Sequence, residues 1–308
     1  MTKSSAPGKI ILFGEHAVVY GRPALAVPVT EVQANVDVSE SARKGVWIGA
    51  PDVNLSAELN VLPSDHPIAS VIHNFLFLAR VTSFPNLEIK ITSTIPVASG
   101  LGSGAAVTVA LTRALASHLK HPMNDEEVNA FAYEIEKLHH GTPSGIDNTV
   151  VTYARPVYFI KGQSIETFKV SKPFMIVIAD TGISAPTKES VGDVRRLWMH
   201  DRSRWETIFD KIGEVSFTAR RALEAGKPEL LGELMNENHE LLQKLTVSSQ
   251  ELDHLVETAR RAGALGAKLS GGGRGGNMIA FVEPERAQAV SFSLLEAGAK
   301  NTIITQVS

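Results

Sequence analysis

One segment, Pro96–Ala106, constrains the fold more than any other part of the 308-residue chain. It reads PVASGLGSGAA and joins a segment that alternates in polarity, 87–91, to an alanine- and leucine-rich segment without glycine or proline, 105–119. The first pattern predicts a β-strand and the second an α-helix. Glycine tolerates backbone conformations that other residues avoid, so the glycines of the segment permit a tight turn between strand and helix. The chain is therefore expected to mix both kinds of structure.

The rest of the first half supports this expectation. Residues 25–38 alternate between apolar and polar side chains, as a half-buried strand does. Asn124 is a good N-cap residue, and Glu127 completes a capping box for a helix. Helical spacing places four apolar residues on one buried face: Val128, Phe131, Ile135 and Leu138. Glu136 lies on the flank of that face, where its carboxylate can point into a cleft.

The second half is also expected to mix strands and helices. Strands are predicted at 174–179, 277–282 and 301–306. Helices are predicted over 189–224, 228–245 and 284–297, and Ser248 with Glu251 predicts a capping box for a further helix that ends at Gly263. No low-complexity linker separates the halves. A boundary near residue 172 gives two α+β domains, 1–172 and 173–308, that share a cleft.

The turn in Pro96–Ala106 allows two interpretations. A glycine-rich turn before a helix presents unpaired backbone N–H groups and the positive end of the helix dipole, which together bind phosphate. The segment has neither the ending of a Walker loop nor the spacing of a Rossmann loop. The alternative is a flexible turn without a ligand, and the segment alone does not decide between them.

A second glycine cluster, 271–276, is interrupted by Arg274. Each glycine in regular structure costs roughly 0.5–1 kcal/mol relative to alanine, so a plain turn does not need so many. Close approach of the backbone to a ligand or to another loop explains the cluster. The alternative is a disordered surface loop, although apolar segments flank both ends.

Two further stretches combine glycine with polar side chains. APGKIILFGEHAVVYG contains a cation, an anion and an imidazole in Lys9, Glu15 and His16. Such a trio is more often a surface ion cluster than a site. GTPSGIDN places Asp147 in a turn after a predicted helix, and a lone turn aspartate is usually a local cap.

Composition excludes several classes of protein. The chain has no cysteine, which removes disulfides and thiolate metal sites and is compatible with a reducing cytosol. A net charge of -3 argues against a nucleic-acid partner. No stretch approaches the roughly 18 apolar residues that span a bilayer, and the apolar run after Lys9 is too short for a signal peptide. We therefore expect a cytoplasmic protein without a membrane or nucleic-acid partner.

Taken together, four stretches resemble the motifs of one superfamily. APGKIILFGEHAVVYG, PVASGLGSGAA, HHGTPSGIDN and LSGGGRGGN occur in the order found in galactokinase, homoserine kinase, mevalonate kinase and phosphomevalonate kinase, the GHMP kinases. The likeness runs from Ala6 to about Val282. It is strongest to the mevalonate kinases, because galactokinases carry arginine where this chain has Lys9, and because DTGISAPTKE at 180–189 resembles the mevalonate kinase pattern.

The resemblance implies a fold, a reaction and two cofactors. The implied fold is α+β in two domains, an ATP-binding N-terminal domain like domain 2 of ribosomal protein S5, with a left-handed βαβ crossover, and a ferredoxin-like C-terminal domain. The implied reaction uses ATP and Mg²⁺ to phosphorylate the C5 hydroxyl of (R)-mevalonate in isoprenoid biosynthesis. Family members are commonly dimers, so by analogy a homodimer is implied.

The resemblance also assigns roles. Asp147 is expected to accept the hydroxyl proton and Lys9 to neutralise developing charge, while Glu136 and Ser103 hold the magnesium ion. The residues expected to line the mevalonate pocket are Glu15, His16, Asp147 and Thr187. The residues expected to bind the nucleotide are Lys9, Ser93, Ala98, Ser99, Gly100, Leu101, Gly102, Ser103 and Gly104.

Two departures from the family pattern leave roles open. Family loops often end in two serines, the second of which binds magnesium, but here Gly104 follows Ser103. The metal ligand is then Ser103, a water molecule or Glu136 alone. The second glycine cluster has Arg274 where unbroken glycine is common, and Asn277 where cysteine is frequent. Arg274 can contact phosphate or face solvent, and we expect solvent because charged loop residues are mostly exposed.

Two other functions stay open on the sequence. One is a sibling kinase that acts on phosphomevalonate or another small hydroxy acid. The other is a nucleotide-binding regulator without catalysis, against which the presence of Lys9, Glu136 and Asp147 argues.

Overall fold

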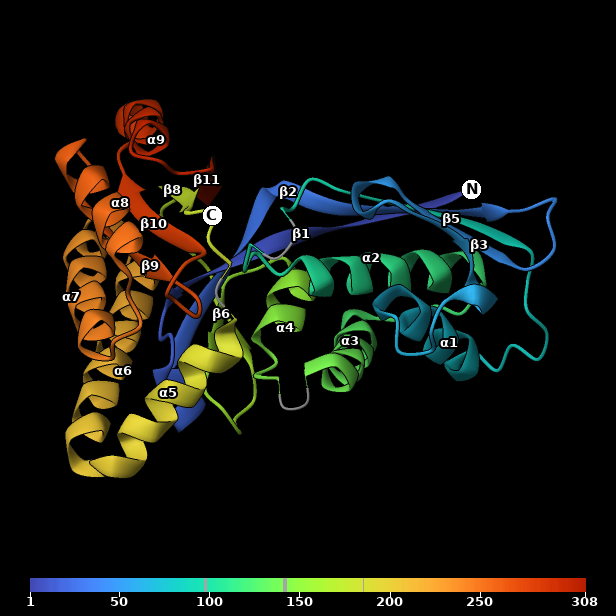
Figure 1. Ribbon diagram of the computed structural model, residues 1–308, viewed down its shortest axis with the longest axis horizontal. Coiled ribbons are helices and arrows are strands. Elements are labelled where there is room, and N and C mark those ends of the chain that lie inside the picture. The colour runs from blue at the N-terminus through green and yellow to red at the C-terminus, as the bar shows by residue number, and fades with distance from the viewer. Residues whose placement is uncertain (97–98, 141–142, 185) are drawn as a thin grey trace. The chain divides into compact units, whose positions relative to one another are not determined.

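The computed structural model describes the chain apart from residues 97–98, 141–142 and 185 and the side chain of His140. The chain forms two compact units, whose elements are labelled in Figure 1. Unit 1 comprises Met1–Gly8, Val32–Val97 and Leu101–Ala154, and unit 2 comprises Lys9–Glu31, Ala98–Gly100 and Arg155–Ser308.

A seven-stranded sheet has the order β4-β3-β5-β2-β6-β7, with β1 also paired to β2. Its strands are β1 (Thr2–Phe13), β2 (Ala24–Glu40), β3 (Val46–Ala50), β4 (Leu55–Glu58), β5 (Leu87–Ser93), β6 (Val157–Phe159) and β7 (Glu166–Thr167). Within unit 1, β2 pairs antiparallel to β5, and β3 pairs parallel to β5 with Ile48 opposite Ile89. The strands predicted at 25–38 and 87–91 are confirmed.

Four described helices lie on one side of the unit 1 strands in Figure 1: α1 (Pro67–Leu78), α2 (Ser103–His118), α3 (Asp125–His140) and α4 (Ile146–Tyr153). Helix α2 contacts the other three. Its Val109, Leu111 and Leu115 side chains are fully buried. Each such side chain stabilises the fold by roughly 1.5–3 kcal/mol when buried. Because α2 also contacts the other three helices, it is the central helix of this core. The helix predicted over 105–119 is confirmed, but it begins two residues earlier, at Ser103, so that Gly104 lies in its first turn.

The capping box of α3 is confirmed, but its buried face differs from the prediction at one end. Asn124 and Glu127 exchange two hydrogen bonds of 2.8 and 2.9 Å. Leu138, however, is 63% exposed. The inward-facing position of the last turn is His139, whose Nε2 lies 2.9 Å from the Ser70 hydroxyl oxygen.

Unit 2 contains a four-stranded antiparallel sheet of order β11-β8-β10-β9. Its strands are β8 (Phe174–Asp180), β9 (Gly266–Ser270), β10 (Asn277–Val282) and β11 (Asn301–Val307). Helices α7 (Leu231–Lys244) and α8 (Gln250–Arg261) contact β9, and α9 (Ala287–Glu296) contacts β8 and β11. The first strand of this sheet lies between the last and the third, which is the ferredoxin-like order. Every residue of the central strand β10 is buried.

Several predicted helix boundaries in unit 2 are wrong. The segment 189–224 is two helices, α5 (Thr187–His200) and α6 (Arg202–Glu224). They are separated by Asp201, whose side chain accepts a backbone hydrogen bond from the first turn of α6 at 3.1 Å. Helix α8 is capped by Ser249 rather than Ser248, because the Ser248 hydroxyl donates to Asp253. Short 3₁₀ turns precede α7 and α9 at Pro228–Leu230 and Pro284–Arg286.

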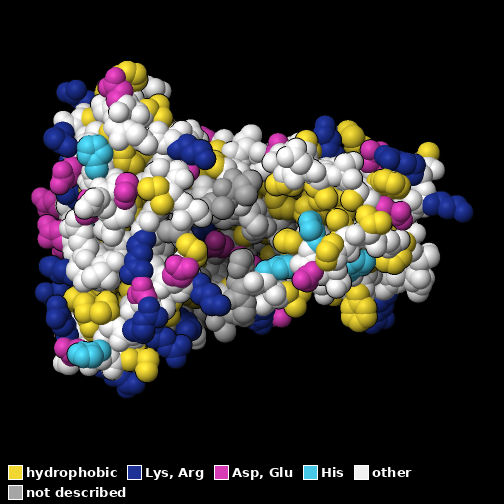
Figure 2. Space-filling model, viewed as in Figure 1, with side chains coloured by type: hydrophobic (Ala, Val, Ile, Leu, Met, Phe, Trp, Pro, Cys, Tyr) yellow, Lys and Arg dark blue, Asp and Glu magenta, His cyan; other side chains and the backbone are white. Residues whose placement is uncertain are grey.

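The outer faces of α5 and α6 carry basic side chains interspersed with acidic ones (Figure 2). The exposed charged residues there include Lys188, Glu189, Arg195, Arg196, Asp201, Arg202, Arg204 and Asp210. Such mixing is typical of a solvated helix surface. In the described part of the chain, no helix combines the length and the apolar character needed to cross a bilayer.

Candidate active site

Lys9, Glu15 and His16 occupy the end of β1 and the turn that follows it, in unit 2. Their exposed fractions are 6%, 2% and 5%. The neighbouring apolar residues Leu12 and Phe13 are completely buried and hold this segment in the core of the unit. The alternative of a surface ion cluster is therefore wrong.

Glu15 is paired with a lysine that sequence reasoning missed. Lys268 Nζ, on β9, donates to Glu15 Oε1 and also to the Leu269 carbonyl oxygen at 2.6 Å. Both charged side chains are at most 1% exposed. Burial raises the pKa of Glu15 and lowers the pKa of Lys268, and the opposite charge of each partner counteracts the other's shift. The available signal was a lysine inside the apolar stretch GAKLS, directly before the second glycine cluster.

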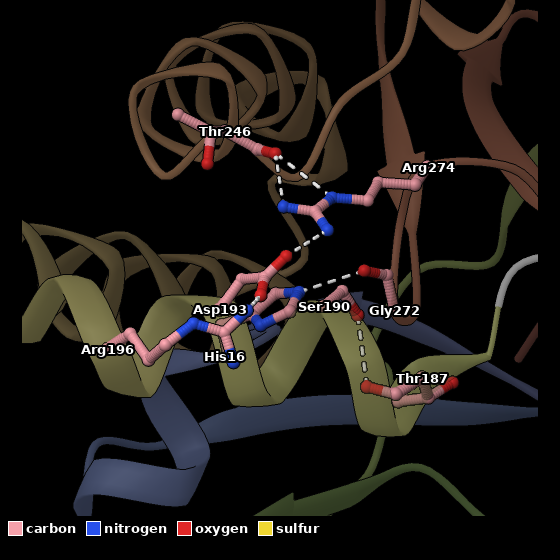
Figure 3. Close-up of polar contacts among 8 residues, drawn as sticks. All are labelled: His16, Thr187, Ser190, Asp193, Arg196, Thr246, Gly272 and Arg274. Carbon is pink, nitrogen blue, oxygen red and sulfur yellow. Dashed lines mark hydrogen bonds and ion pairs between the residues drawn. The ribbon is translucent and has the colours of Figure 1, made fainter.

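His16 lies against that glycine cluster (Figure 3). Its Nε2 donates to the Gly272 carbonyl oxygen at 3.0 Å. Burial lowers the pKa of His16 to about 4, and the charge of Arg274 acts in the same direction, so the ring is neutral at pH 7. A neutral ring with the proton on Nε2 leaves Nδ1 as an acceptor, and Nδ1 has no hydrogen-bond partner among the described residues. A ligand hydroxyl can fill this acceptor.

Thr187, the first residue of α5, lies close to the same glycine. A Cβ atom at Gly272 would be 2.8 Å from Thr187 Oγ1, and a Cβ atom at Gly273 would be 1.9 Å from the Val247 carbonyl oxygen. Only glycine fits at these two positions. The prediction of a close approach to another loop is therefore confirmed, and the alternative of a disordered surface loop is wrong.

Arg274 and Asn277 both bind protein groups. Arg274 forms an ion pair with Asp193 of α5, and its side chain is 34% exposed, so it is partly open to solvent as expected and also bound to a protein group. Asn277 Nδ2 donates to the Ser99 carbonyl oxygen and would lie 3.7 Å from a Cβ atom at Gly100. The asparagine that replaces the frequent cysteine thus links the end of the second glycine cluster to Ser99 and Gly100, within unit 2.

Unit 1 holds the other expected nucleotide-binding residues. Ser93 ends β5, and its hydroxyl oxygen accepts a backbone N–H bond at 3.1 Å. Gly102 precedes α2, and Ser103 and Gly104 form its first turn. The first N–H groups of an α-helix lack partners within the helix and attract anions. Leu101 is buried, and Ala98 lies outside the described residues.

Asp147 lies in the first turn of α4, after Gly145, and not in an irregular turn as predicted. The adjacent Asn148 Nδ2 donates to Asn129 Oδ1 of α3 at 2.6 Å, which fixes α4 against α3. Glu136 lies further along α3. Both acidic side chains are half-buried. The helices that carry them are therefore locked together in unit 1.

Oxygen donors suited to magnesium are present in unit 1. The Ser103 hydroxyl and the Glu136 carboxylate are half-buried and belong to α2 and α3, which contact each other. Magnesium usually takes one or two protein oxygens and completes its shell with waters and substrate phosphates. Across the described residues, no three or more His, Asp or Glu side chains gather as a closed metal site. The Ser103 hydroxyl and the Glu136 carboxylate are oxygen donors of the kind that magnesium takes.

The expected site residues are divided between the units. Unit 2 contains Lys9, Glu15, His16, Ser99, Gly100 and Thr187, and unit 1 contains Ser93, Leu101, Gly102, Ser103, Gly104, Glu136 and Asp147. In unit 2 the structure brings His16 and Thr187 together at Gly272. Lys9 and Asp147 belong to different units.

Sequence comparison matches the GHMP kinases N terminal domain to residues 68–155 and the GHMP kinases C terminal family to residues 219–300. The chain is 38% identical to the mevalonate kinase of Thermococcus gammatolerans, over 99% of this chain and 96% of that protein. It is 36% identical to the mevalonate kinase of Pyrococcus abyssi, over 99% and 95% of the two chains. The chain belongs to the mevalonate kinase family of the GHMP kinases.

Solved structures of this family have the same fold. The L. major mevalonate kinase in complex with R-mevalonate matches with a TM-score of 0.88 at 30% identity, over 100% of this chain and 96% of that one. The Methanococcus jannaschii mevalonate kinase matches with a TM-score of 0.85 at 27% identity, over 99% and 96%. The two-domain GHMP kinase fold is therefore confirmed, and the protein is an ATP-dependent kinase.

Proposed function

We propose that this kinase transfers the γ-phosphoryl group of ATP to the C5 hydroxyl of (R)-mevalonate, giving (R)-5-phosphomevalonate and ADP. The observation that carries the proposal is 38% identity, over nearly the whole length of both chains, to a mevalonate kinase. The structural match to an enzyme crystallised with R-mevalonate supports the same substrate. The reaction belongs to isoprenoid biosynthesis.

The substrate-binding residues in this proposal are Glu15, His16 and Thr187 of unit 2 and Asp147 of unit 1. The neutral His16 ring accepts a hydrogen bond from a substrate hydroxyl at Nδ1, because its Nε2 already donates to Gly272. A buried acceptor of this kind favours an alcohol over an analogue without the hydroxyl, since the analogue leaves the nitrogen unpaired.

The nucleotide in this proposal is bound by Ser93 and by the loop from Ala98 to Gly104. Backbone N–H groups at the start of α2 donate to its phosphate oxygens. Ser103 and Glu136 hold Mg²⁺, which neutralises phosphate charge when it is bound. Gly104 offers no side-chain oxygen, so Ser103 is the loop residue assigned to the metal.

Asp147 and Lys9 act on the reacting hydroxyl in this proposal. Phosphoryl transfer depends mainly on positioning and on the stabilisation of charge on the transferring oxygens. Asp147 accepts the proton of the C5 hydroxyl while the hydroxyl oxygen attacks the γ-phosphorus of ATP. The Lys9 ammonium group stabilises the negative charge that develops on that oxygen. Both roles require the two side chains to meet at one alcohol.

A coupled assay of ADP release tests the proposed reaction. We expect turnover with (R)-mevalonate, and loss of at least roughly a hundredfold in kcat for Asp147→Asn with ATP affinity unchanged. Turnover with phosphomevalonate alone would reassign the protein to a sibling kinase. ATP binding without turnover of any alcohol would identify a regulator.

Three further expectations are part of the same proposal. The N-terminal ATP-binding domain spans 1–172 and the C-terminal domain 173–308. The protein acts in the cytoplasm, as its cysteine-free composition allows. It forms a homodimer, by analogy with its family.

A further inference from the structure

Arg274 occupies a backbone position that favours glycine. Its φ angle is 61°, and the residues on both sides of it, Gly273 and Gly275, also have positive φ. Left-handed backbone is unfavourable for a residue that carries a Cβ atom. Glycine is therefore the residue that the backbone at this position favours.

The guanidinium group of Arg274 bridges two other elements of unit 2 (Figure 3). Its Nη1 pairs with Asp193 Oδ2 on α5. Its Nε and Nη2 donate to the Thr246 carbonyl oxygen, in the loop before α8, at 3.3 and 3.4 Å. Each of the three guanidinium nitrogens therefore has a protein partner. We name these three residues the Arg274 bridge.

Three backbone hydrogen bonds of the described residues hold the same segment. Arg274 N donates to the Val247 carbonyl oxygen at 2.8 Å, Gly276 N donates to the Ile183 carbonyl oxygen at 2.9 Å, and the Gly276 carbonyl oxygen accepts from Thr181 N at 2.9 Å. None of these partners belongs to α5. The bridge to Asp193 is the described side-chain ion pair that ties the glycine segment to the helix beginning at Thr187.

This tie acts where two expected substrate residues meet. Gly272 accepts a hydrogen bond from His16 and lies so close to Thr187 that a side chain at Gly272 would clash. A small shift of the glycine segment relative to α5 therefore changes the distance between His16 and Thr187. The charge of Arg274 also helps to keep the pKa of His16 low.

We propose that Arg274 is a positioning residue, which through Asp193 and Thr246 holds Gly272 between His16 and Thr187 and so sets the affinity for the substrate alcohol. This inference rests on the proposed function of the pocket. The described contacts of Arg274 are all with protein groups, so we expect its removal to affect substrate binding rather than the chemical step.

The substitution Arg274→Gly tests this inference, because glycine fits the backbone angle and removes only the side chain. We expect KM for (R)-mevalonate to rise about tenfold, with kcat and KM for ATP each changed less than about twofold. Arg274→Lys keeps the charge and should recover part of the loss. The matched control is Arg80→Gly, at an exposed arginine of unit 1 with φ 54°, which should leave all three constants unchanged.

A double-mutant cycle with Asp193→Asn completes the test. If the bridge acts as a unit, Arg274→Gly combined with Asp193→Asn raises KM for mevalonate no more than Arg274→Gly alone. The inference is overturned if KM for mevalonate is unaltered in Arg274→Gly, whether or not kcat falls. It is also overturned if the effects of Arg274→Gly and Asp193→Asn on KM multiply in the double variant. Failure of the proposed function is distinct, because the wild-type protein then fails to turn over mevalonate.

Discussion

At the scale of single residues, unit 2 contains charged and polar groups in places where apolar side chains are usual. Lys268 lies in a strand whose five residues are all buried, and its own side chain is completely buried. Its partner Glu15 follows the buried end of β1. Such a pair stabilises little in net terms, because removing two charges from water is costly. Removing one partner alone, however, leaves the other charge buried and unpaired, which is strongly destabilising.

This dependence predicts that removing one partner of the pair destabilises the protein more than removing both charges. Lys268→Met should lower the free energy of unfolding by about 3–5 kcal/mol, because the Glu15 carboxylate is left buried and unpaired. Adding Glu15→Gln to Lys268→Met should restore most of that loss. Urea denaturation of the two single variants and the double variant measures both effects. Equal, additive losses would mean that the two side chains are not coupled.

At the scale of elements, the helices of unit 2 differ in how closely neighbouring elements approach them. Gly192 in α5 faces open space, since a Cβ atom there would meet only Arg196 Nη1, at 3.9 Å. Gly213 in α6 faces Arg22, with a Cβ atom 3.0 Å from Arg22 Cγ. Arg22 cannot move aside easily, because it pairs with Asp210 of the same helix. The second glycine is therefore tightly packed and the first is not.

Alanine substitutions separate these two glycines. Gly192→Ala should raise the free energy of unfolding by roughly 0.5–1 kcal/mol, the helix propensity gained when glycine becomes alanine. Gly213→Ala should give no gain or a loss, because the added methyl group meets Arg22. Thermal or urea unfolding of both variants measures the difference. Equal stabilisation by the two substitutions would contradict the close packing of α6 against Arg22.

At the scale of the whole molecule, local features were predictable from the sequence and long-range contacts were not. The capping box at Asn124 depends on residues three apart, and it was predicted correctly. The Lys268–Glu15 pair joins residues 253 positions apart, and the Arg274–Asp193 pair joins residues 81 apart. No periodic pattern in the sequence indicates such pairings, because the partners meet only when β9 and α5 take their places in the folded chain. Leu138 was placed wrongly for a related reason, since contacts with α1 decide which side of the last α3 turn is buried.

Global stability should depend on pH through two buried histidines of unit 2. His239 is 2% exposed, and its Nε2 lies 3.1 Å from Asp253 Oδ1. Burial lowers the pKa of His239 to about 4 although the Asp253 charge acts in the opposite direction, and burial lowers the pKa of His16 to about 4 as well. Between the ordinary histidine pKa of about 6.5 and these values, the unfolded chain binds more protons than the folded one. The stability that these two neutral histidines allow is therefore complete above pH 6.5, and it is lost as the pH falls towards 4.

The contribution of each histidine is separable by substitution. Each should contribute about 1 kcal/mol per pH unit to the slope of unfolding free energy between pH 6 and 4.5. His239→Gln removes one titrating group, so its slope should be shallower than that of the wild-type protein by that amount. His16→Gln should show a similar reduction, and the double variant the sum of the two. Carboxylates without a histidine neighbour also titrate in this range but affect all the variants alike, so the differences between slopes decide. If the slope of His239→Gln equals that of the wild-type protein, His239 is protonated in the folded state across this range and its burial does not control its charge.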